Sequence, residues 1–173
     1  MKHLVITVIG QDRPGLVGAL SDTVYQHKGN WLGSSMSKLA GQFAGILQVD
    51  IPEESVKPLR QAMSKLDGLN IHIAEDTKIT APPAQLQQLT VTGNDRSGIV
   101  KEVTTRLGEL GINIHKLKTD THSAPNWGYP IFTAWFELEI PAEVAVSTVQ
   151  QQLESLADDL TIDFEEPESS EAH

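Results

Sequence analysis

The sequence contains no cysteine. This absence excludes disulfide bonds, catalysis by a thiolate and zinc sites with cysteine ligands. No stretch approaches the roughly 18 consecutive apolar residues that a membrane-spanning helix needs. The N-terminus does not read as a signal peptide, because Asp12 and Arg13 follow the first short apolar run too soon. We therefore expect a cytoplasmic protein with no membrane partner.

Basic residues are scarce in the second half of the chain. Residues 1–83 carry eight Lys or Arg and eight Asp or Glu, whereas residues 84–173 carry five against fifteen. The second half therefore holds the whole net charge of −10, and four of its acids crowd into the last nine residues. We expect a disordered acidic tail at 167–173. Without a basic stripe, direct nucleic-acid binding is not expected, although an acidic surface can meet a basic face of another protein.

Signatures of metal binding and catalysis are missing as well. The six histidines show no ligand spacing. The chain has neither a Gly-x-Ser-x-Gly elbow nor a phosphate-binding loop. We therefore expect no metal, no cofactor and no enzymatic activity. The enzymatic alternative that stays open is a small hydrolase in which His122 acts as the base and Asp120 orients it.

The chain does contain a duplicated segment. Val8–Val17 recurs 83 positions later as Val91–Val100, with six of ten residues identical. A period this long indicates duplication of a whole domain. In both copies the segment runs from an alternating strand, through a Gly-x-Asp-Arg-x-Gly turn, into an amphipathic helix.

The apolar spacing around this turn predicts the same six elements in each copy. Their order is βαββαβ, the ferredoxin-like arrangement of the α+β class, with two helices on one face of a four-stranded antiparallel sheet. The third strand and the second helix carry the clearest matched patterns. They are expected near 43–51 and 56–66 in the first copy and near 132–140 and 146–156 in the second.

The expected boundaries follow from this pattern. The first domain spans 1–80, a short stiff connector spans 81–85, and the second domain spans 86–166. The sheet face without helices is left open, and Ile46 and Trp135 are expected on it. Burying such side chains against another unit is favourable, so we expect a homodimer or a pairing of the two units.

The second copy has six extra residues, which fall in 120–130. Its prolines and glycine predict a loop or a long hairpin rather than regular structure. Trp127 and Tyr129 lie in this segment, and both residue types are enriched at interfaces. We expect the loop either to cover the second turn or to contact a partner protein. The alternative is that Trp127 packs on its own hairpin.

The turn is the strongest candidate for a ligand site. Gly15 and Gly98 lack a Cβ, so a ligand can approach the start of each helix. Free N–H groups and the helix dipole favour a carboxylate there, and Asp12 and Asp95 can accept hydrogen bonds from an ammonium group. The alternative is that the aspartates cap the helices and the glycines relieve strain.

Two further pairs of residues have both functional and structural interpretations. Arg13 and Arg96 can bind a carboxylate through two hydrogen bonds, but such arginines more often are solvated or form ion pairs. Asn30 and Asn113, which open the second strands, can hydrogen-bond a ligand across from the turn. A role in forming a turn fits these asparagines equally well.

The duplicated turn and the βαββαβ order resemble the ACT domain, a regulatory module that typically binds amino acids where two such domains meet. The tandem form without an attached enzyme, including Ile-Pro-Glu-Glu at 51–54, is similar to ACT regulators of the glycine cleavage system. The resemblance implies a repressor that responds to a small amino acid, with glycine as first candidate, and acts by contacting a DNA-binding transcriptional activator. The alternative is control of another metabolic enzyme.

The resemblance and the turn chemistry together define the expected ligand-binding residues. Ser97 replaces Pro14 of the first copy, so the two turns need not bind the same ligand. The expected residues are Asp12, Arg13, Gly15, Leu16 and Asn30 in the first copy and Asn94, Asp95, Arg96, Ser97, Gly98, Ile99 and Asn113 in the second.

Overall fold

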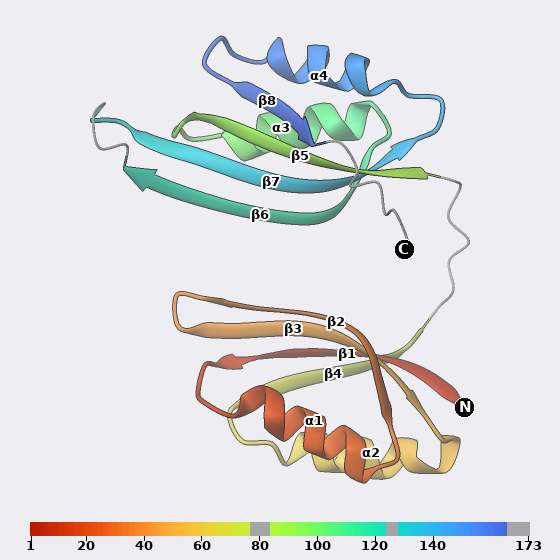
Figure 1. Ribbon diagram of the computed structural model, residues 1–173. Helices are drawn as coiled ribbons and strands as arrows, with labels where there is room; N and C mark the ends of the chain where they lie inside the picture. Colours follow the sequence, from red (N-terminus) through yellow and green to blue (C-terminus); the bar gives the residue numbers. More distant parts are fainter. Residues whose placement is uncertain (77–83, 124–127, 166–173) are drawn as a thin grey trace, which may run out of the picture. The chain divides into compact units, whose positions relative to one another are not determined.

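The computed structural model of the 173-residue chain describes residues 1–76, 84–123 and 128–165 (Figure 1). The chain divides into two compact units, Met1–Ile79 and Thr80–His173. The expected tail at 167–173, connector residues 81–83 and Trp127 lie outside the described residues. The strand that opens the second unit begins at Ala84, inside the expected connector at 81–85.

The first unit has the predicted order βαββαβ, with a single 3-10 turn before its second helix (Figure 1). Its strands form one antiparallel sheet in the order β2-β3-β1-β4. The elements are β1 (Lys2–Gln11), α1 (Leu16–Gln26), β2 (Asn30–Leu39), β3 (Gln42–Ile51), the 3-10 turn (Glu53–Ser55), α2 (Val56–Ser64) and β4 (Leu69–Glu75).

The second unit repeats this topology with the sheet order β6-β7-β5-β8. The prediction of two ferredoxin-like units of the α+β class is therefore confirmed. The elements are β5 (Ala84–Asn94), α3 (Ile99–Glu109), β6 (Asn113–Ser123), β7 (Pro130–Pro141), α4 (Val146–Glu154) and β8 (Thr161–Glu165).

Each unit has its own core between one sheet face and its two helices. Alternate residues of β3, from Phe43 to Ile51, are buried, and β7 repeats the pattern from Phe132 to Ile140. Leu20 on α1 is fully buried among them. Each such side chain contributes about 1.5–3 kcal/mol relative to exposure. The strand period of two and the helix period near 3.6 therefore fix which face of each element points inward.

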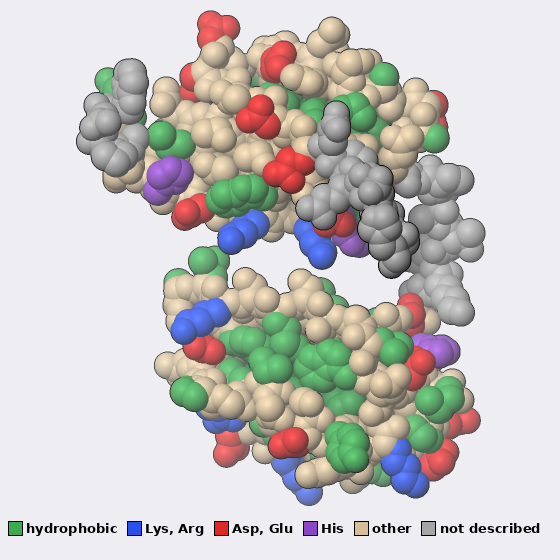
Figure 2. Space-filling model, in the orientation of Figure 1, with side chains coloured by type: hydrophobic (Ala, Val, Ile, Leu, Met, Phe, Trp, Pro, Cys, Tyr) green, Lys and Arg blue, Asp and Glu red, His purple; other side chains and the backbone are tan. Residues whose placement is uncertain are grey.

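The other sheet face of each unit is open within the described residues. Ile46 lies on this face of the first sheet with 54% of its surface exposed, and Trp135 lies on that of the second with 39% exposed. The Lys118 ammonium lies over the Trp135 ring, 5.4 Å from its centroid, and so covers part of the indole. Figure 2 shows a green patch of hydrophobic side chains on the visible side of the first unit. Burial of Ile46 and Trp135 against a partner stays a prediction.

The segment 120–130 is more regular than a loop. β6 continues to Ser123 and β7 starts at Pro130, so the second unit has a long β-hairpin. Of the two expected forms, the long hairpin is therefore the one found, and 120–123 are regular strand residues that pair with 130–133 of β7. Tyr129 is 66% exposed at the base of the hairpin tip.

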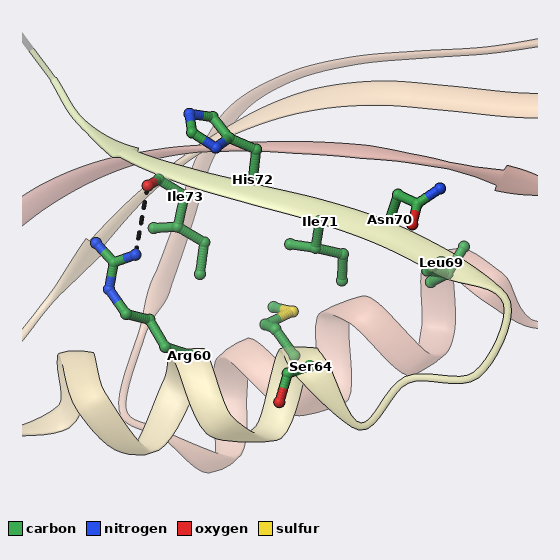
Figure 3. A pocket seen from close by; sticks show the side chains of 8 residues that line it. Arg60, Ser64, Leu69, Asn70, Ile71, His72 and Ile73 are labelled. Carbon is green, nitrogen blue, oxygen red and sulfur yellow. Dashed lines mark hydrogen bonds between the residues drawn. The ribbon is translucent and has the colours of Figure 1, made fainter.

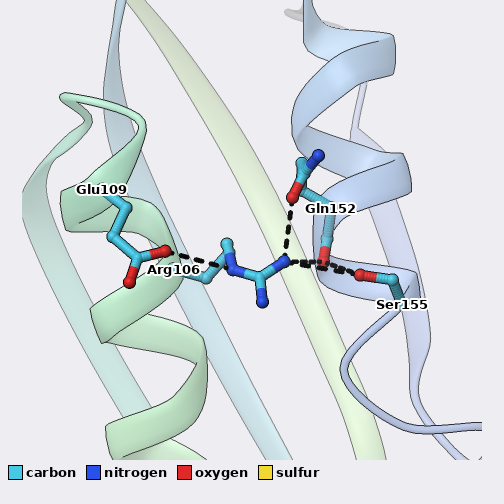
Figure 4. Close-up of polar contacts among 4 residues, drawn as sticks. All are labelled: Arg106, Glu109, Gln152 and Ser155. Carbon is cyan, nitrogen blue, oxygen red and sulfur yellow. Dashed lines mark hydrogen bonds and ion pairs between the residues drawn. The ribbon is translucent and has the colours of Figure 1, made fainter.

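The helices of the second unit are tied together by one arginine. Arg106 on α3 donates from Nη1 to the Gln152 carbonyl oxygen (3.2 Å), to Gln152 Oε1 (2.8 Å) and to Ser155 Oγ (3.4 Å), as Figure 4 shows. Its Nε lies 3.4 Å from Glu109 Oε2. Thr23 holds the equivalent position on α1 and donates to the Ala19 carbonyl of its own helix instead. This contact between α3 and α4 is therefore particular to the second unit.

Candidate functional site

The Gly-x-Asp-Arg-x-Gly turn adopts nearly the same backbone conformation in both units. Gly15 and Gly98 are the N-cap residues of α1 and α3, with left-handed φ angles of 84° and 88°. Residues that carry a side chain rarely adopt this backbone conformation, so glycine is required at both positions. No side chain caps either helix, so the first N–H groups of α1 and α3 have no partner within the helix. These groups and the helix dipole create a weakly positive site.

The aspartates do not cap the helices, so that part of the structural alternative is wrong, whereas the left-handed φ angles of Gly15 and Gly98 agree with its other part, that the glycines relieve strain. Instead, the hairpin that joins the second and third strands holds the turn in each unit. The Asp12 N–H donates to the Gly41 carbonyl oxygen at 3.0 Å, and the Asp95 N–H donates to the Pro130 carbonyl oxygen at 2.9 Å. In the first unit the Asp12 carboxylate also pairs with Lys38 Nζ at 2.9 Å. The long hairpin thus meets the second turn through its Pro130 end.

The second turn already contains an anion paired with its arginine. Arg96 donates from Nη1 and Nη2 to the two carboxylate oxygens of Glu102, at 3.0 and 2.5 Å. Glu102 lies in the first turn of α3, where the helix dipole favours a negative charge. The hydrogen bond from Arg96 holds the pKa of the Glu102 carboxyl below its ordinary value, and the same bond raises the pKa of Arg96. We call this pair the Arg96–Glu102 clasp.

The first turn has no equivalent of the clasp. The first helical turn of α1 contains no acidic residue. Ala19 stands at the position that Glu102 holds in the second unit. Arg13 is exposed. The two turns therefore share a backbone and differ in electrostatics, because only α3 has an acidic residue, Glu102, in its first helical turn.

The expected asparagines lie far from the turns within their own units. In the first sheet Asn30 is opposite Asp50 and Asp50 is opposite His3, whereas the turn follows Gln11. Eight residues of β1 separate these two ends, or about 26 Å at ~3.3 Å per residue. The prediction that Asn30 faces the turn of its own unit is wrong.

Asn113 stands at the same distant end of the second sheet, because it is opposite Glu139 and Glu139 is opposite Leu86. Its amide donates to Glu139 Oε2 at 3.2 Å. In both units the helix after the turn carries the chain back along the sheet, so the second strand starts at the far end. The sequence could have indicated this, because every right-handed crossover has that geometry.

The remaining expected residues divide into core and surface. Leu16 and Ile99 are each only 3% exposed and anchor the first helical turn to the core. Ser97 and Asn94 are exposed, and the Asn94 N–H donates to Asp159 Oδ2 at 3.1 Å. Sequence reasoning missed Lys38, Glu102 and Asp159, because each reaches the turn from another element and no spacing signals it.

The residues proposed for a hydrolase lie on the hairpin of the second unit. Asp120 and His122 are exposed, two positions apart on β6. In the described ranges no group of three or more His, Asp or Glu side chains is placed to hold a metal ion. None of the helices in the described part of the chain has the length and apolarity to cross a bilayer.

Two ACT-domain family models match the chain, one over residues 2–73 and the other over residues 85–159. The chain belongs to the ACT-domain family. It carries two ACT domains in tandem, as the resemblance implied, and it is an ACT-domain regulatory protein. ACT domains generally bind small amino acids.

The chain is also similar to several known proteins. The chain is 39% identical over 67 residues to a UPF0237 protein of Methanopyrus kandleri, a match that covers 38% of this chain and 74% of the relative. The solved structure of an unknown protein from Galdieria sulphuraria is similar with a TM-score of 0.84 and 31% identity, covering 96% of this chain and 98% of that one. A protein provisionally assigned as a glycine cleavage system transcriptional repressor shares the fold, with a TM-score of 0.67, 17% identity and coverage of 96% and 98%.

Proposed function

We propose that this protein is an amino-acid-responsive repressor of the glycine cleavage system that acts in the cytoplasm by contacting a DNA-binding activator. The small amino acid, glycine first, binds at the first turn, Asp12–Gly15. The observation that carries the proposal is the uncapped start of α1, with no acidic residue in its first turn. Membership of the ACT family makes an amino acid the expected ligand.

The chemistry of the first turn suits an amino-acid zwitterion. The ligand carboxylate accepts hydrogen bonds from the first N–H groups of α1, where a negative charge is favoured by about 0.3–1 kcal/mol. The ammonium group faces Asp12, whose carboxylate Lys38 already orients. A Cβ built on Gly15 or Gly18 meets nothing within 4 Å, so this side of the turn is open. Because the turn is exposed, we expect affinity near the millimolar range, about −4 kcal/mol.

The second turn is the weaker candidate. Glu102 places a carboxylate beside the start of α3, and Arg96 is already bonded to it. A ligand carboxylate would meet like charge there and would have to displace the clasp. We therefore propose one principal site in each chain.

The partner is inferred from charge and from fold. The second half of the chain holds the whole net charge of −10, and this charge is complementary to the basic surface that a DNA-binding protein presents. The fold that the chain shares with a protein assigned as a glycine cleavage repressor agrees with a role in transcriptional control. If no activator binds, control of a metabolic enzyme becomes the better proposal.

Exchanging the clasp between the two turns tests the site. Ala19→Glu gives the first turn the carboxylate that the second turn has, and Glu102→Ala removes it from the second. Calorimetric titration with glycine and then with the other standard amino acids should show binding to the wild-type protein. Binding should weaken about ten-fold or more in Ala19→Glu, and Glu102→Ala should keep the first site.

Ala19→Gln is the matched control, because it adds the bulk of glutamate without the charge. A loss of binding in Ala19→Gln equal to that in Ala19→Glu would point to crowding rather than charge. Absence of binding by the wild-type protein to every amino acid would sink the proposed ligand class. The partner is tested separately by sedimentation of the protein with the purified activator, with and without glycine.

A further inference from the structure

The described residues contain four edge strands, β2 and β4 in the first sheet and β6 and β8 in the second. Proteins usually protect such edges with bulges, charges or short length. β2 and β6 each have a register irregularity, and each carries lysine, at Lys38 and at Lys116 and Lys118. β8 has only five residues, and two of them are acidic.

β4 has neither a register irregularity nor a lysine, and its one charged residue is Glu75 at its C-terminal end. It pairs with β1 through seven consecutive residues without a register shift. From Leu69 to Ala74 it contains no Lys, Arg, Asp or Glu. A regular, uncharged edge of this kind is a template for pairing with another strand.

Two hydrogen bonds show which backbone groups of β4 face outward. The Asp76 N–H donates to the His3 carbonyl oxygen at 2.8 Å, so the even-numbered residues of this segment face β1. The Ile73 carbonyl oxygen instead accepts a hydrogen bond from Arg60 Nη1 at 3.4 Å (Figure 3). The N–H and C=O groups of Leu69, Ile71 and Ile73 therefore point away from the sheet.

A groove lies directly beside this edge. It has a volume of about 460 Å³ between α2 and β4. Its lining combines the apolar side chains of β4 with Arg60, Ser64 and the buried Met63 of α2 (Figure 3). The β4 members, Leu69, Ile71 and Ile73, are each half-buried, and Arg60 crosses one end of the groove.

We propose that the β4 edge is the interface between two copies of this chain, paired antiparallel around a two-fold axis at Ile71. In this register Leu69 of each copy meets Ile73 of the other on the helix side of the sheet. On the opposite side Asn70 meets His72. Apolar side chains thus face apolar ones and polar side chains face polar ones on both sides.

Charged side chains of both signs stand at the two ends of the edge, where Glu75 is paired with Lys2 of its own chain at 3.5 Å. Arg60 stands beside Ile73, and Asp67 lies just before Leu69 in the exposed turn that leads into β4. The two-fold axis brings Arg60 of one copy to Asp67 of the other, twice. Arg60 gives up its long hydrogen bond to Ile73, and that carbonyl oxygen joins the new ladder. Three outward residues in each copy supply about six backbone hydrogen bonds.

Sedimentation velocity of the full chain over a wide concentration range, with charge-exchange variants, tests the register. Wild-type protein should dimerise reversibly. Arg60→Asp and Asp67→Arg should each weaken dimerisation about ten-fold or more, because each places like charges together twice. The double variant Arg60→Asp/Asp67→Arg should recover most of the affinity. Both residues are exposed, so circular dichroism should show every variant folded.

Amide hydrogen exchange adds a measurement that needs no substitution. Raising the protein concentration should slow exchange at Ile71 and Ile73 and leave His72 unchanged, because the His72 N–H already faces β1. A monomer at every concentration overturns the proposal, and so does a dimer in which the double variant is no better than the single ones. If Trp135→Glu abolishes dimerisation while Arg60→Asp and Asp67→Arg leave it intact, the interface lies on the open sheet faces instead.

Discussion

The first glycine of the duplicated turn offers a sharp comparison between the two units. A Cβ at Gly10 would lie 2.4 Å from the Gly68 carbonyl oxygen and 2.6 Å from Leu69 Cδ2. A Cβ at Gly93 would lie 2.7 Å from Leu160 Cδ2, and the nearest backbone atom, the Asp159 carbonyl oxygen, would be 3.5 Å away. A flexible side-chain end can move, whereas a backbone carbonyl at the start of a paired strand cannot move cheaply.

This difference sets the expected magnitudes. Overpacking of a core typically costs about 1–3 kcal/mol, and Gly10→Ala belongs at the upper end because backbone must shift. Gly93→Ala belongs at the lower end. Alanine also restricts the unfolded chain, which offsets about 0.4–1 kcal/mol in both variants. We therefore expect Gly10→Ala to lower the free energy of unfolding of the first unit by about 2 kcal/mol, and Gly93→Ala to change that of the second by less than about 1 kcal/mol.

Urea unfolding followed by amide exchange in each unit measures both changes. Gly18→Ala is a suitable control, because a Cβ there meets nothing within 4 Å and alanine favours the helix by up to about 1 kcal/mol. Equal losses at Gly10 and Gly93, or a larger loss at Gly93, would refute the argument that the carbonyl of Gly68 makes the first unit intolerant.

Three further predictions concern the second unit. Because Arg96 lowers the pKa of Glu102, the clasp stabilises the fold fully at pH values above the ordinary carboxyl pKa. This stabilisation is lost as the pH falls through the lowered pKa of Glu102. The difference in melting temperature between the wild-type protein and Glu102→Gln should therefore shrink on acidification. Arg106→Ala should lower the free energy of unfolding by about 1 kcal/mol in chemical denaturation, since α3 and α4 lose their shared donor, whereas Lys101→Ala should leave it nearly unchanged. Deleting 126–129 should reduce partner binding in sedimentation and leave glycine binding at the first turn unchanged, and a loss of thermal stability alone would make the hairpin structural.

The fold could be read from the sequence because it depends on periodicity. The alternation from Phe43 to Ile51 and its copy in β7 indicated the inward faces of both central strands, and duplication supplied an internal check on every element. The same periodicity also indicated that Ile46 and Trp135 belong to the open faces. Such patterns are local, and the burial of one sheet face makes their register unambiguous.

The site was less predictable because its contacts join elements that are distant in sequence. The hydrogen bond from Asp12 to Gly41 depends on where the hairpin between β2 and β3 turns, and nothing in the turn motif encodes that meeting. Arg96 and Glu102 are six residues apart, a spacing with no helical meaning, because Arg96 precedes the helix. Asn30 was misplaced because its position in sequence follows the turn while α1 returns the chain to the opposite end of the sheet.

The most direct test of the central claim is a glycine titration followed by amide chemical shifts in the wild-type protein. We expect saturable shifts at Leu16, Val17 and Gly18, which form the first helical turn of α1, and much smaller shifts at Ile99 and Val100 in α3. Saturable shifts confined to α3, or no shift at either turn with any amino acid, would contradict the assignment of the first turn as the amino-acid site.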